Sequence, residues 1–323
     1  MKLSLVVPVF NEVENLAALH AEVVAAMDQA ALDFELILVD DGSHDGSVPL
    51  MLKLAQQDPR VKVILLRRNF GQTAAMAAGF AAAGGEVVIP MDGDLQNDPA
   101  DIAALVAKLD EGYDVVSGWR ARRQDRFFSR RLPSILANGL ISRMTGVHLH
   151  DYGCTLKAYR REVLAEVNLY GELHRFVPAL ASQIGCRVTE IPVNHRARQA
   201  GTSKYGIDRT LRVILDLVTV KFLLKYATRP MQLFGKWGVL TLLLAGLSGA
   251  TTLWMKFFDG LSMNRNPLTI LTAFLLFTGV QFIVMGLLGE LVTRTYHEVQ
   301  DKPIYTIRET RNLDRKNSQP KAG

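Results

Sequence analysis

Two long apolar runs near the C-terminus constrain this chain more than any other feature of its sequence. They are Trp237–Met255 and Pro267–Gly289, and neither contains a charged residue. As a helix rising about 1.5 Å per residue, the shorter run spans about 28 Å, close to the hydrocarbon thickness of a bilayer. A helical hairpin buried in a soluble core is the alternative. Because both runs reach spanning length, we expect two transmembrane helices.

The charges that flank these runs predict their orientation. Lys and Arg gather in Lys221–Lys236 and again in the tail after Arg294. The positive-inside rule therefore places both flanks in the cytoplasm. The net charge of +5 suits an anionic membrane surface. The sequence carries no zinc-finger, helix-turn-helix or aromatic RNA-binding signature, so we expect no nucleic-acid partner.

The chain before these runs alternates strand-like and helix-like segments. We expect strands at Leu3–Val7, Glu35–Val39, Val61–Leu66, Val87–Met91, Val115–Ser117 and Val188–Val193. We expect helices at Glu14–Met27, Val48–Gln56, Thr73–Ala83, Ile102–Leu109 and Ser129–Thr145. This alternation predicts an α/β domain with a doubly wound, mainly parallel sheet. The strands are rich in Val, Ile and Leu without alternation, as expected where helices cover both faces.

These patterns divide the chain into four parts. Residues 1–206 form the α/β domain, and residues 207–231 form an amphipathic juxtamembrane helix. Residues 232–293 hold the two transmembrane helices, and residues 294–323 form a basic cytoplasmic tail. The apolar stripe of Ile207–Phe222 fits a helix on the membrane surface or one packed on the α/β domain, and both remain open.

Acidic residues follow two of the predicted strands. Asp92-Gly93-Asp94 offers two carboxylates that can bind Mg²⁺ or Mn²⁺ together with diphosphate oxygens. Asp40-Asp41 can accept hydrogen bonds from a ribose or a base. Alone, either could be an ordinary acidic turn that caps a helix. Parallel strands end at one edge of a sheet, where four carboxylates would repel one another without a cation or a donor-rich ligand.

Basic residues follow the fifth and sixth predicted strands. The segments His195–Arg198 and Gly201–Tyr205 form a loop that can close over a diphosphate, or else a basic patch that faces solvent or lipid. Guanidinium groups suit phosphate, and we expect Arg120 and one of Arg130 and Arg131 to bind one. The full arginine cluster is Arg120, Arg122, Arg123, Arg130 and Arg131.

In this order, the motifs resemble glycosyltransferase family 2, whose fold is called GT-A. Val7–Glu12, Val39–Ser43 and Met91–Gln96 look like its nucleotide-sugar signature. Three further motifs resemble the polyprenyl-phosphate branch, which includes dolichol-phosphate mannose synthases and bacterial undecaprenyl-phosphate glycosyltransferases. They are Asp151–Cys154, Glu190–Val193 and Arg198–Tyr205, and Gln281–Glu290 looks like the second span of two-span bacterial members. The resemblance covers Leu3 to Tyr305.

The resemblance implies a role for each motif. The nucleotide would contact Pro8, Phe10, Glu12, Asp40, Asp41, Asp92 and Gly93. Asp92, Asp94 and Gln96 would hold Mg²⁺ or Mn²⁺, and Arg198 and Lys204 would grip the diphosphate. The acceptor phosphate would meet Arg120, Arg130, Arg131 and Ser134. Asp151, Asp94 and Lys204 would be catalytic.

The implied activity is inverting transfer of a sugar from a nucleotide diphosphate donor to polyprenyl phosphate, namely undecaprenyl phosphate. A UDP-sugar is the preferred donor and a GDP-sugar the alternative. The product would be a lipid-linked monosaccharide for cell-envelope glycan or lipid A modification. The resemblance also implies an oligomer of identical chains, such as a tetramer, in the bacterial inner membrane with both termini cytoplasmic. A phosphate monoester is largely dianionic at neutral pH, so Asp151 would position the acceptor more than remove a proton.

Two other functions fit parts of the sequence. A processive polysaccharide synthase shares the fold, but its Gln-x-x-Arg-Trp motif is missing and two spans are few for a channel. A membrane-tethered scaffold with a degenerate nucleotide fold would need neither Asp92 and Asp94 nor Arg198 and Lys204. The intact motifs therefore favour the enzyme.

Overall fold

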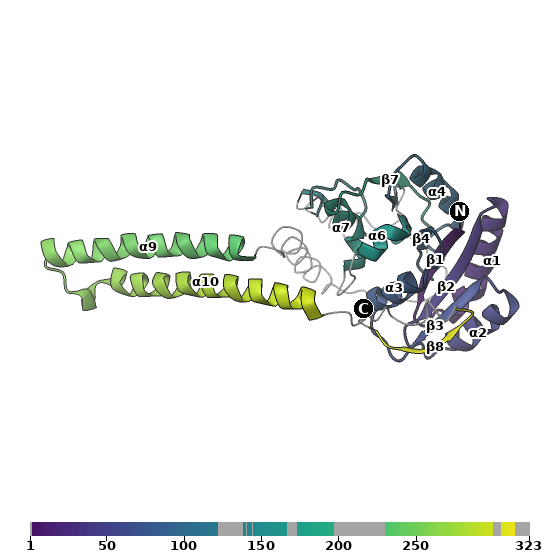
Figure 1. The fold of residues 1–323 in the computed structure, drawn as a ribbon, viewed down its shortest axis with the longest axis horizontal. Helices are drawn as coiled ribbons and strands as arrows, with labels where there is room; N and C mark the ends of the chain where they lie inside the picture. Colours follow the sequence, from purple (N-terminus) through teal and green to yellow (C-terminus); the bar gives the residue numbers. More distant parts are fainter. Residues whose placement is uncertain are drawn as a thin grey trace. The chain divides into compact units, whose positions relative to one another are not determined.

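The computed structural model divides the chain into two units (Figure 1). The α/β unit comprises Met1–Leu217 and Asp301–Gly323, and the helical unit comprises Val218–Gln300. The structure describes residues 2–121, 138–139, 141–143, 145–166, 173–196, 230–299 and 305–313. The predicted juxtamembrane helix Ile207–Phe222 lies outside these residues, as does most of the predicted helix Ser129–Thr145.

An eight-stranded mixed sheet, in the order β7-β5-β6-β4-β1-β2-β3-β8, forms the α/β unit. Its strands are β1 (Lys2–Val9), β2 (Asp33–Asp40), β3 (Val61–Leu66), β4 (Val87–Pro90), β5 (Val115–Trp119), β6 (Lys157–Arg160), β7 (Val188–Pro192) and β8 (Ile307–Arg311). β6 and β8 run antiparallel to their neighbours, and the other six strands share one direction. The carboxyl ends of those six strands therefore meet at one edge, where ligands bind in such sheets.

Helices cover both faces of this sheet, as its uniformly apolar strands predict. They are α1 (Val13–Gln29), α2 (Ser47–Gln57), α3 (Gln72–Ala82), α4 (Ile102–Asp110), α6 (Arg161–Glu166) and α7 (Val177–Gln183), with short 3₁₀ turns at Pro99–Asp101 and Leu173–Arg175. Successive β1 side chains show the two layers. Leu5 packs in the core that holds α1, α2 and α4, whereas Val6 packs in the core that holds α3. Burial on both faces removes any need for polar alternation.

The sequence did not predict β6 and β8. β8 lies in the segment that we read as a cytoplasmic tail, yet it pairs antiparallel with β3 at the edge of the sheet. The Asn312 side chain secures this edge by donating hydrogen bonds to the carbonyl oxygens of Ala55 and Val61, at 2.7 and 2.9 Å. As an edge strand, β8 carries charged side chains, and its sequence resembles an exposed tail.

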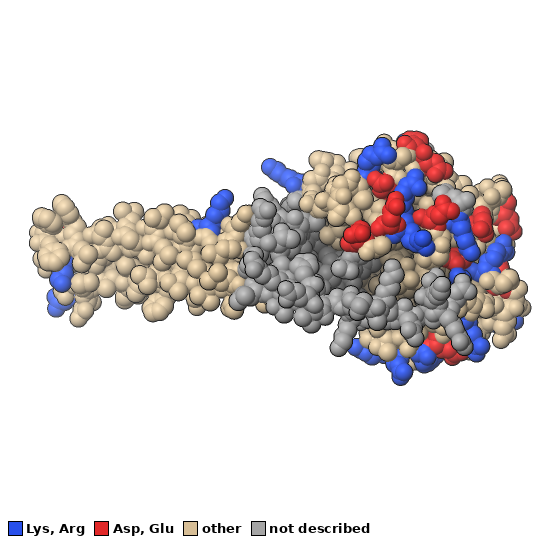
Figure 2. Space-filling view, viewed as in Figure 1, with Lys and Arg blue, Asp and Glu red and all other residues tan. Residues whose placement is uncertain are grey.

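The helical unit consists of α9 (Pro230–Phe258) and α10 (Pro267–Val299), which pack side by side and are joined through a 3₁₀ turn, Met263–Arg265 (Figure 1). Met231–Phe258 and Pro267–Gly289 are long and apolar enough to cross a membrane. Large side chains such as Leu243, Phe257 and Phe277 are exposed, and the visible face of the described part of this unit shows few charged groups in Figure 2. An apolar surface of this extent suits contact with lipid.

Small residues bring the two helices together. A Cβ added at Gly279 would lie 2.7 Å from Cγ of Leu242, so the helices approach too closely there for a larger residue. The Thr272 hydroxyl donates a hydrogen bond of 2.9 Å to Oγ of Ser248 across the same interface. Gly246, unlike Gly279, has open space around it, because nothing lies within 4 Å of an added Cβ. Its hydrogen side chain is therefore not required by the packing of this hairpin.

Candidate active site

The loops that follow β1 and β2 form one wall at the carboxyl edge of the sheet. The strands are in register with Pro8 opposite Val39. The Asn11 N–H donates to Oγ of Ser43 at 2.9 Å, and the His44 N–H donates to Oδ1 of Asn11 at 2.8 Å. Asn11 adopts a left-handed backbone conformation, with φ at 56°. Phe10 and Glu12, which are predicted to contact the nucleotide, lie in this wall, and Pro8 lies just before it in β1.

Asp40 and Asp41 are buried and accept hydrogen bonds from backbone N–H groups. Asp41 accepts one from Phe70 at 2.7 Å and one from Gly71 at 2.9 Å. Asp40 accepts from the N–H groups of its own turn, Gly42 and Ser43. Burial raises the pKa of Asp41, and its backbone donors act in the opposite direction. Backbone N–H groups thus partner two of the four carboxylates, while the nearby charge of Asp40 still raises the pKa of Asp41. That a cation or a donor-rich ligand keeps the four carboxylates apart stays a prediction.

The Asp-x-Asp turn follows β4 directly. Asp94 is buried, and its Oδ1 accepts a hydrogen bond of 3.2 Å from the Gln96 N–H. Leu95 between them has φ at 61°, a left-handed conformation that costs free energy for a bulky side chain. Such strain is concentrated at functional sites in proteins, and here it lies between two of the predicted metal ligands.

The donor atoms of this turn fit a divalent metal. Burial and the nearby charge of Asp94 raise the pKa of Asp92, so the two carboxylates repel one another. A cation between them would relieve that repulsion. The Gln96 amide nitrogen donates to the carbonyl oxygen of Arg196 at 3.4 Å, and its amide oxygen is a further possible ligand. Among the described residues no group of three His, Cys, Asp or Glu side chains is arranged to hold a metal. Oxygens of the bound diphosphate would have to complete the coordination of the metal.

Gly93 separates the two carboxylates. An added Cβ would lie 3.6 Å from the carbonyl oxygen of Pro8 and 3.6 Å from Cγ1 of Val7, which are ordinary contacts. The protein's own packing does not require glycine at this position. Close approach of a ligand remains a prediction.

Arg120 and Asp151, which the sequence assigned to separate motifs, form one ion pair. Two hydrogen bonds join them, from Nε to Oδ2 at 2.6 Å and from Nη2 to Oδ1 at 2.9 Å. Their side chains are 15% and 3% exposed, so water screens the pair weakly. The Asp151 carboxylate raises the pKa of Arg120 against the effect of burial. Five other predicted residues lie outside the described part of the chain: Arg130, Arg131, Ser134, Arg198 and Lys204.

The first residues of the predicted basic loop are attached to the Asp-x-Asp turn. The Arg196 N–H donates to the carbonyl oxygen of Gln96 at 3.0 Å. The Arg196 guanidinium forms ion pairs with Glu22 at 2.6 Å and Asp98 at 2.8 Å. These contacts with two carboxylates hold the Arg196 side chain in place beside the Asp-x-Asp turn.

Three neighbours of the predicted site residues were given no role from sequence: Gln72, Thr155 and Lys157. Lys157 is buried in β6, and its ammonium donates to the carbonyl oxygens of Tyr152, at 3.2 Å, and Cys154. Burial lowers the pKa of Lys157. Single residues of common types carry no motif, so sequence offered no signal for them.

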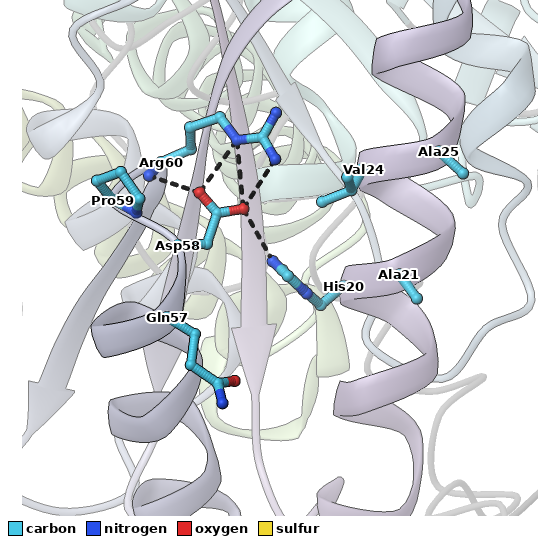
Figure 3. A pocket seen from close by; sticks show the side chains of 8 residues that line it. All are labelled: His20, Ala21, Val24, Ala25, Gln57, Asp58, Pro59 and Arg60. Atoms are coloured by element: carbon cyan, nitrogen blue, oxygen red, sulfur yellow. Dashed lines mark hydrogen bonds and ion pairs between the residues drawn. The ribbon is translucent and has the colours of Figure 1, made fainter.

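An open groove of about 710 Å³ lies away from these residues, between α1 and residues 57–60 (Figure 3). None of the predicted site residues lines it. Its ionisable groups bind one another, since Asp58 accepts from Arg60 at 2.9 Å and contacts His20 at 3.2 Å. We interpret this cluster as a structural ion pair between α1 and the loop before β3.

Solved structures share the fold of this chain. Glucosyl-3-phosphoglycerate synthase from Mycobacterium tuberculosis, solved with Mn²⁺, uridine diphosphate and phosphoglyceric acid, matches 68% of this chain and 78% of its own, with a TM-score of 0.54 and 18% identity. Mannosyl-3-phosphoglycerate synthase from Rubrobacter xylanophilus matches 69% of this chain and 74% of its own, with a TM-score of 0.56 and 15% identity. The α/β unit therefore has the architecture of GT-A glycosyltransferases, and the expected fold class is confirmed.

Sequence comparisons identify the family. Glycosyl transferase family 2 matches residues 4–167, and the GtrB C-terminal hairpin matches residues 229–295. Dodecaprenyl-phosphate galacturonate synthase of Rhizobium johnstonii is 44% identical over 96% of this chain and 93% of its own. Undecaprenyl-phosphate 4-deoxy-4-formamido-L-arabinose transferase of Edwardsiella ictaluri is 40% identical over 94% of this chain and 92% of its own length. The chain belongs to glycosyltransferase family 2, and the hairpin match covers both apolar helices.

Proposed function

We propose that this glycosyltransferase moves a sugar, with inversion, from a UDP-sugar to the phosphate of undecaprenyl phosphate. The observation that carries the proposal is the edge of the sheet, where the segment Asp151–Thr155 contacts both Arg120, through Asp151, and the Asp92–Asp94 turn, through Thr155. The Asp92–Asp94 turn suits a diphosphate with a bound metal, and Arg120 suits a second phosphate. The two relatives named above, both described as acting on polyprenyl phosphates, support the acceptor class.

The proposed cofactor is Mg²⁺ or Mn²⁺. Asp92, Asp94 and the amide oxygen of Gln96 would hold it, and when bound it would offset the negative charge that develops on the leaving diphosphate. The Mn²⁺ in the structure of glucosyl-3-phosphoglycerate synthase supports a divalent ion in this fold. We propose that Arg198 and Lys204 act on the same diphosphate from the basic loop.

The acceptor phosphate is already a nucleophile at neutral pH, because its second pKa is about 6. Arg120 can bind it, and Asp151 fixes the orientation of the Arg120 guanidinium through two hydrogen bonds. This arrangement supports a positioning role for Asp151 rather than proton removal. We propose that Arg130 or Arg131, with Ser134, completes the acceptor site.

The helical hairpin would keep the active site at the cytoplasmic surface of the inner membrane. A polyprenyl tail stays in the bilayer, so its phosphate is presented at that surface. We propose that the lipid-linked monosaccharide serves cell-envelope glycan or lipid A modification, and that the enzyme is an oligomer of identical chains.

Full-length protein in undecaprenyl phosphate-containing membranes would test this function with a panel of UDP- and GDP-sugars. We expect one donor to release its nucleoside diphosphate in an acceptor-dependent way and to give a lipid that carries a single sugar. A growing glycan chain would instead indicate a processive synthase. Binding of nucleotide without turnover of any donor would indicate a scaffold.

A further inference from the structure

The Asp92 carboxylate is held from two directions by neutral hydrogen-bond donors. Nε2 of Gln72, at the start of α3, donates to Oδ1 at 2.9 Å. Oγ1 of Thr155, in the loop before β6, donates to Oδ2 at 2.7 Å. The Asp92 N–H donates to Oδ1 of Asn97 at 3.1 Å, which fixes the backbone as well. Rotation of the carboxylate would break at least one of the two side-chain bonds.

The character of these donors matters for the charge of the site. Asp151 is paired with the cation Arg120, so its charge is neutralised locally. The donors to Asp92 are an amide and a hydroxyl, which orient a carboxylate without cancelling its charge. Each oxygen also has more than one acceptor position. Asp92 can therefore keep its two bonds to the protein and still offer a negative oxygen to a cation.

The segment that contains Thr155 also reaches Arg120. Its neighbour Leu156 is fully buried, and the Leu156 carbonyl accepts a hydrogen bond of 2.9 Å from Gly118 of β5. Asp151, four residues before Thr155, holds Arg120. One short stretch of chain thus contacts Arg120 at one end and the Asp-x-Asp turn at the other.

We propose that Thr155 and Gln72 are positioning residues, which orient the Asp92 carboxylate toward the divalent cation that would accompany the donor diphosphate. Thr155 additionally links that carboxylate to the segment that holds Arg120. The inference rests on the proposed function, because it assumes that Asp92 serves the donor. Sequence motifs of the site include neither residue.

Calorimetric binding of UDP to the full-length protein, with and without Mn²⁺, tests this role. Thr155→Val keeps the shape and removes the hydroxyl, Thr155→Ser keeps the hydroxyl, and Thr189→Val makes the same change on β7 as a control. We expect Thr155→Val to weaken Mn²⁺-dependent UDP binding about tenfold, the scale of a hydrogen bond to a charged group. Thr155→Ser and Thr189→Val should stay within about twofold of the wild type by the same reasoning.

The outcomes separate the inference from the function on which it rests. Asp92→Asn is measured first. If that variant binds UDP with Mn²⁺ as the wild type does, the donor role of Asp92 fails and the inference fails with it. If Asp92→Asn loses binding but Thr155→Val does not, only the inference is overturned. A Thr155→Ser variant as weak as Thr155→Val also overturns it, because the hydroxyl would then not be the relevant group.

Discussion

The Arg120 guanidinium and the Asp151 carboxylate form two parallel hydrogen bonds, at 2.6 and 2.9 Å, in a nearly buried site. A pair with this geometry acts as a unit. Neither residue can be assigned a role without the other. The sequence suggested an arginine for the acceptor phosphate and an aspartate near it. In the structure, the Asp151 carboxylate accepts both hydrogen bonds and so holds the Arg120 guanidinium in place.

Asp151→Asn should lower kcat/KM for undecaprenyl phosphate by about 10- to 100-fold, because a hydrogen bond to a charged group is worth about 1.5–3 kcal/mol. KM for the donor should change little. In a double-mutant cycle, the variant that combines Arg120→Gln with Asp151→Asn should have a kcat/KM no lower than that of the less active of the two single variants. Steady-state kinetics on folded protein decide this, and losses that simply multiply would argue that the two residues act independently.

Asp94→Asn should reduce turnover at least about 100-fold while changing the free energy of unfolding by less than about 1 kcal/mol, since it removes a charged ligand but keeps the shape. Chelation of the wild type should abolish turnover, and Mg²⁺ or Mn²⁺ should restore it. The measurement is the rate against metal concentration. Wild-type rates for Asp94→Asn at limiting metal would refute the metal assignment.

Gly42→Ala should destabilise the protein by about 2–4 kcal/mol. Gly42 has φ at +77°, and an added Cβ would lie 2.7 Å from the backbone nitrogen of Asn69. Gly46→Ala is the matched control. Gly46 has φ at +95°, but its nearest neighbour would be a Val13 side chain at 3.8 Å, so it should cost only about 1–2 kcal/mol. Equal losses in denaturant unfolding would contradict the steric argument.

Acid should weaken the contact between α1 and the loop before β3. Hydrogen bonds from Arg60, above all, lower the pKa of Asp58 to about 2. An unfolded aspartate titrates near pH 3.9, so this stabilisation, of about 2 kcal/mol, is complete above about pH 4 and is lost as the pH falls toward 2. Unfolding of wild type and Asp58→Asn should therefore differ at pH 6 and converge near pH 2. A difference that persists at pH 2 would exclude this ionisation as the cause.

A chain that ends before residue 230 should be less stable than its α/β motifs suggest. It lacks β8 and Asn312, which cover the edge of β3. An exposed edge strand favours aggregation. The matched variant replaces residues 230–300 with a flexible Gly/Ser linker and keeps β8. We expect the linked variant to be monodisperse by light scattering and to bind UDP, and the short chain to aggregate. Equal behaviour would mean that β8 is dispensable.

The sequence predicted the central sheet well because buried parallel strands carry strong apolar runs. Val61–Leu66 was predicted with its observed ends, and α1 to α4 differ from their predicted bounds by one or two residues. The same reasoning failed for β6 and β8. Their pairing partners are antiparallel and distant, and their charged side chains match the pattern of loops.

The site was predictable to the level of motifs and not of contacts. Asp92 and Asp94 could be placed at a strand end because their turn follows an apolar run. That Asp41 would bond to the backbone of Phe70 and Gly71 depends on how two loops pack. Such packing is set by tertiary structure, which leaves no periodic trace in a single sequence.

The position of β8 at the end of the chain has a consequence for biosynthesis. Roughly 240 residues separate the end of β3 from the start of β8, so at about 5–20 residues per second the ribosome needs tens of seconds to supply the missing edge. Both apolar helices are translated within that interval. The sheet can close only after the hairpin has left the ribosome. Completion of the α/β unit therefore reports that the apolar hairpin has been made, and a nascent chain stalled before β8 keeps an unfinished sheet that chaperones and proteases can recognise.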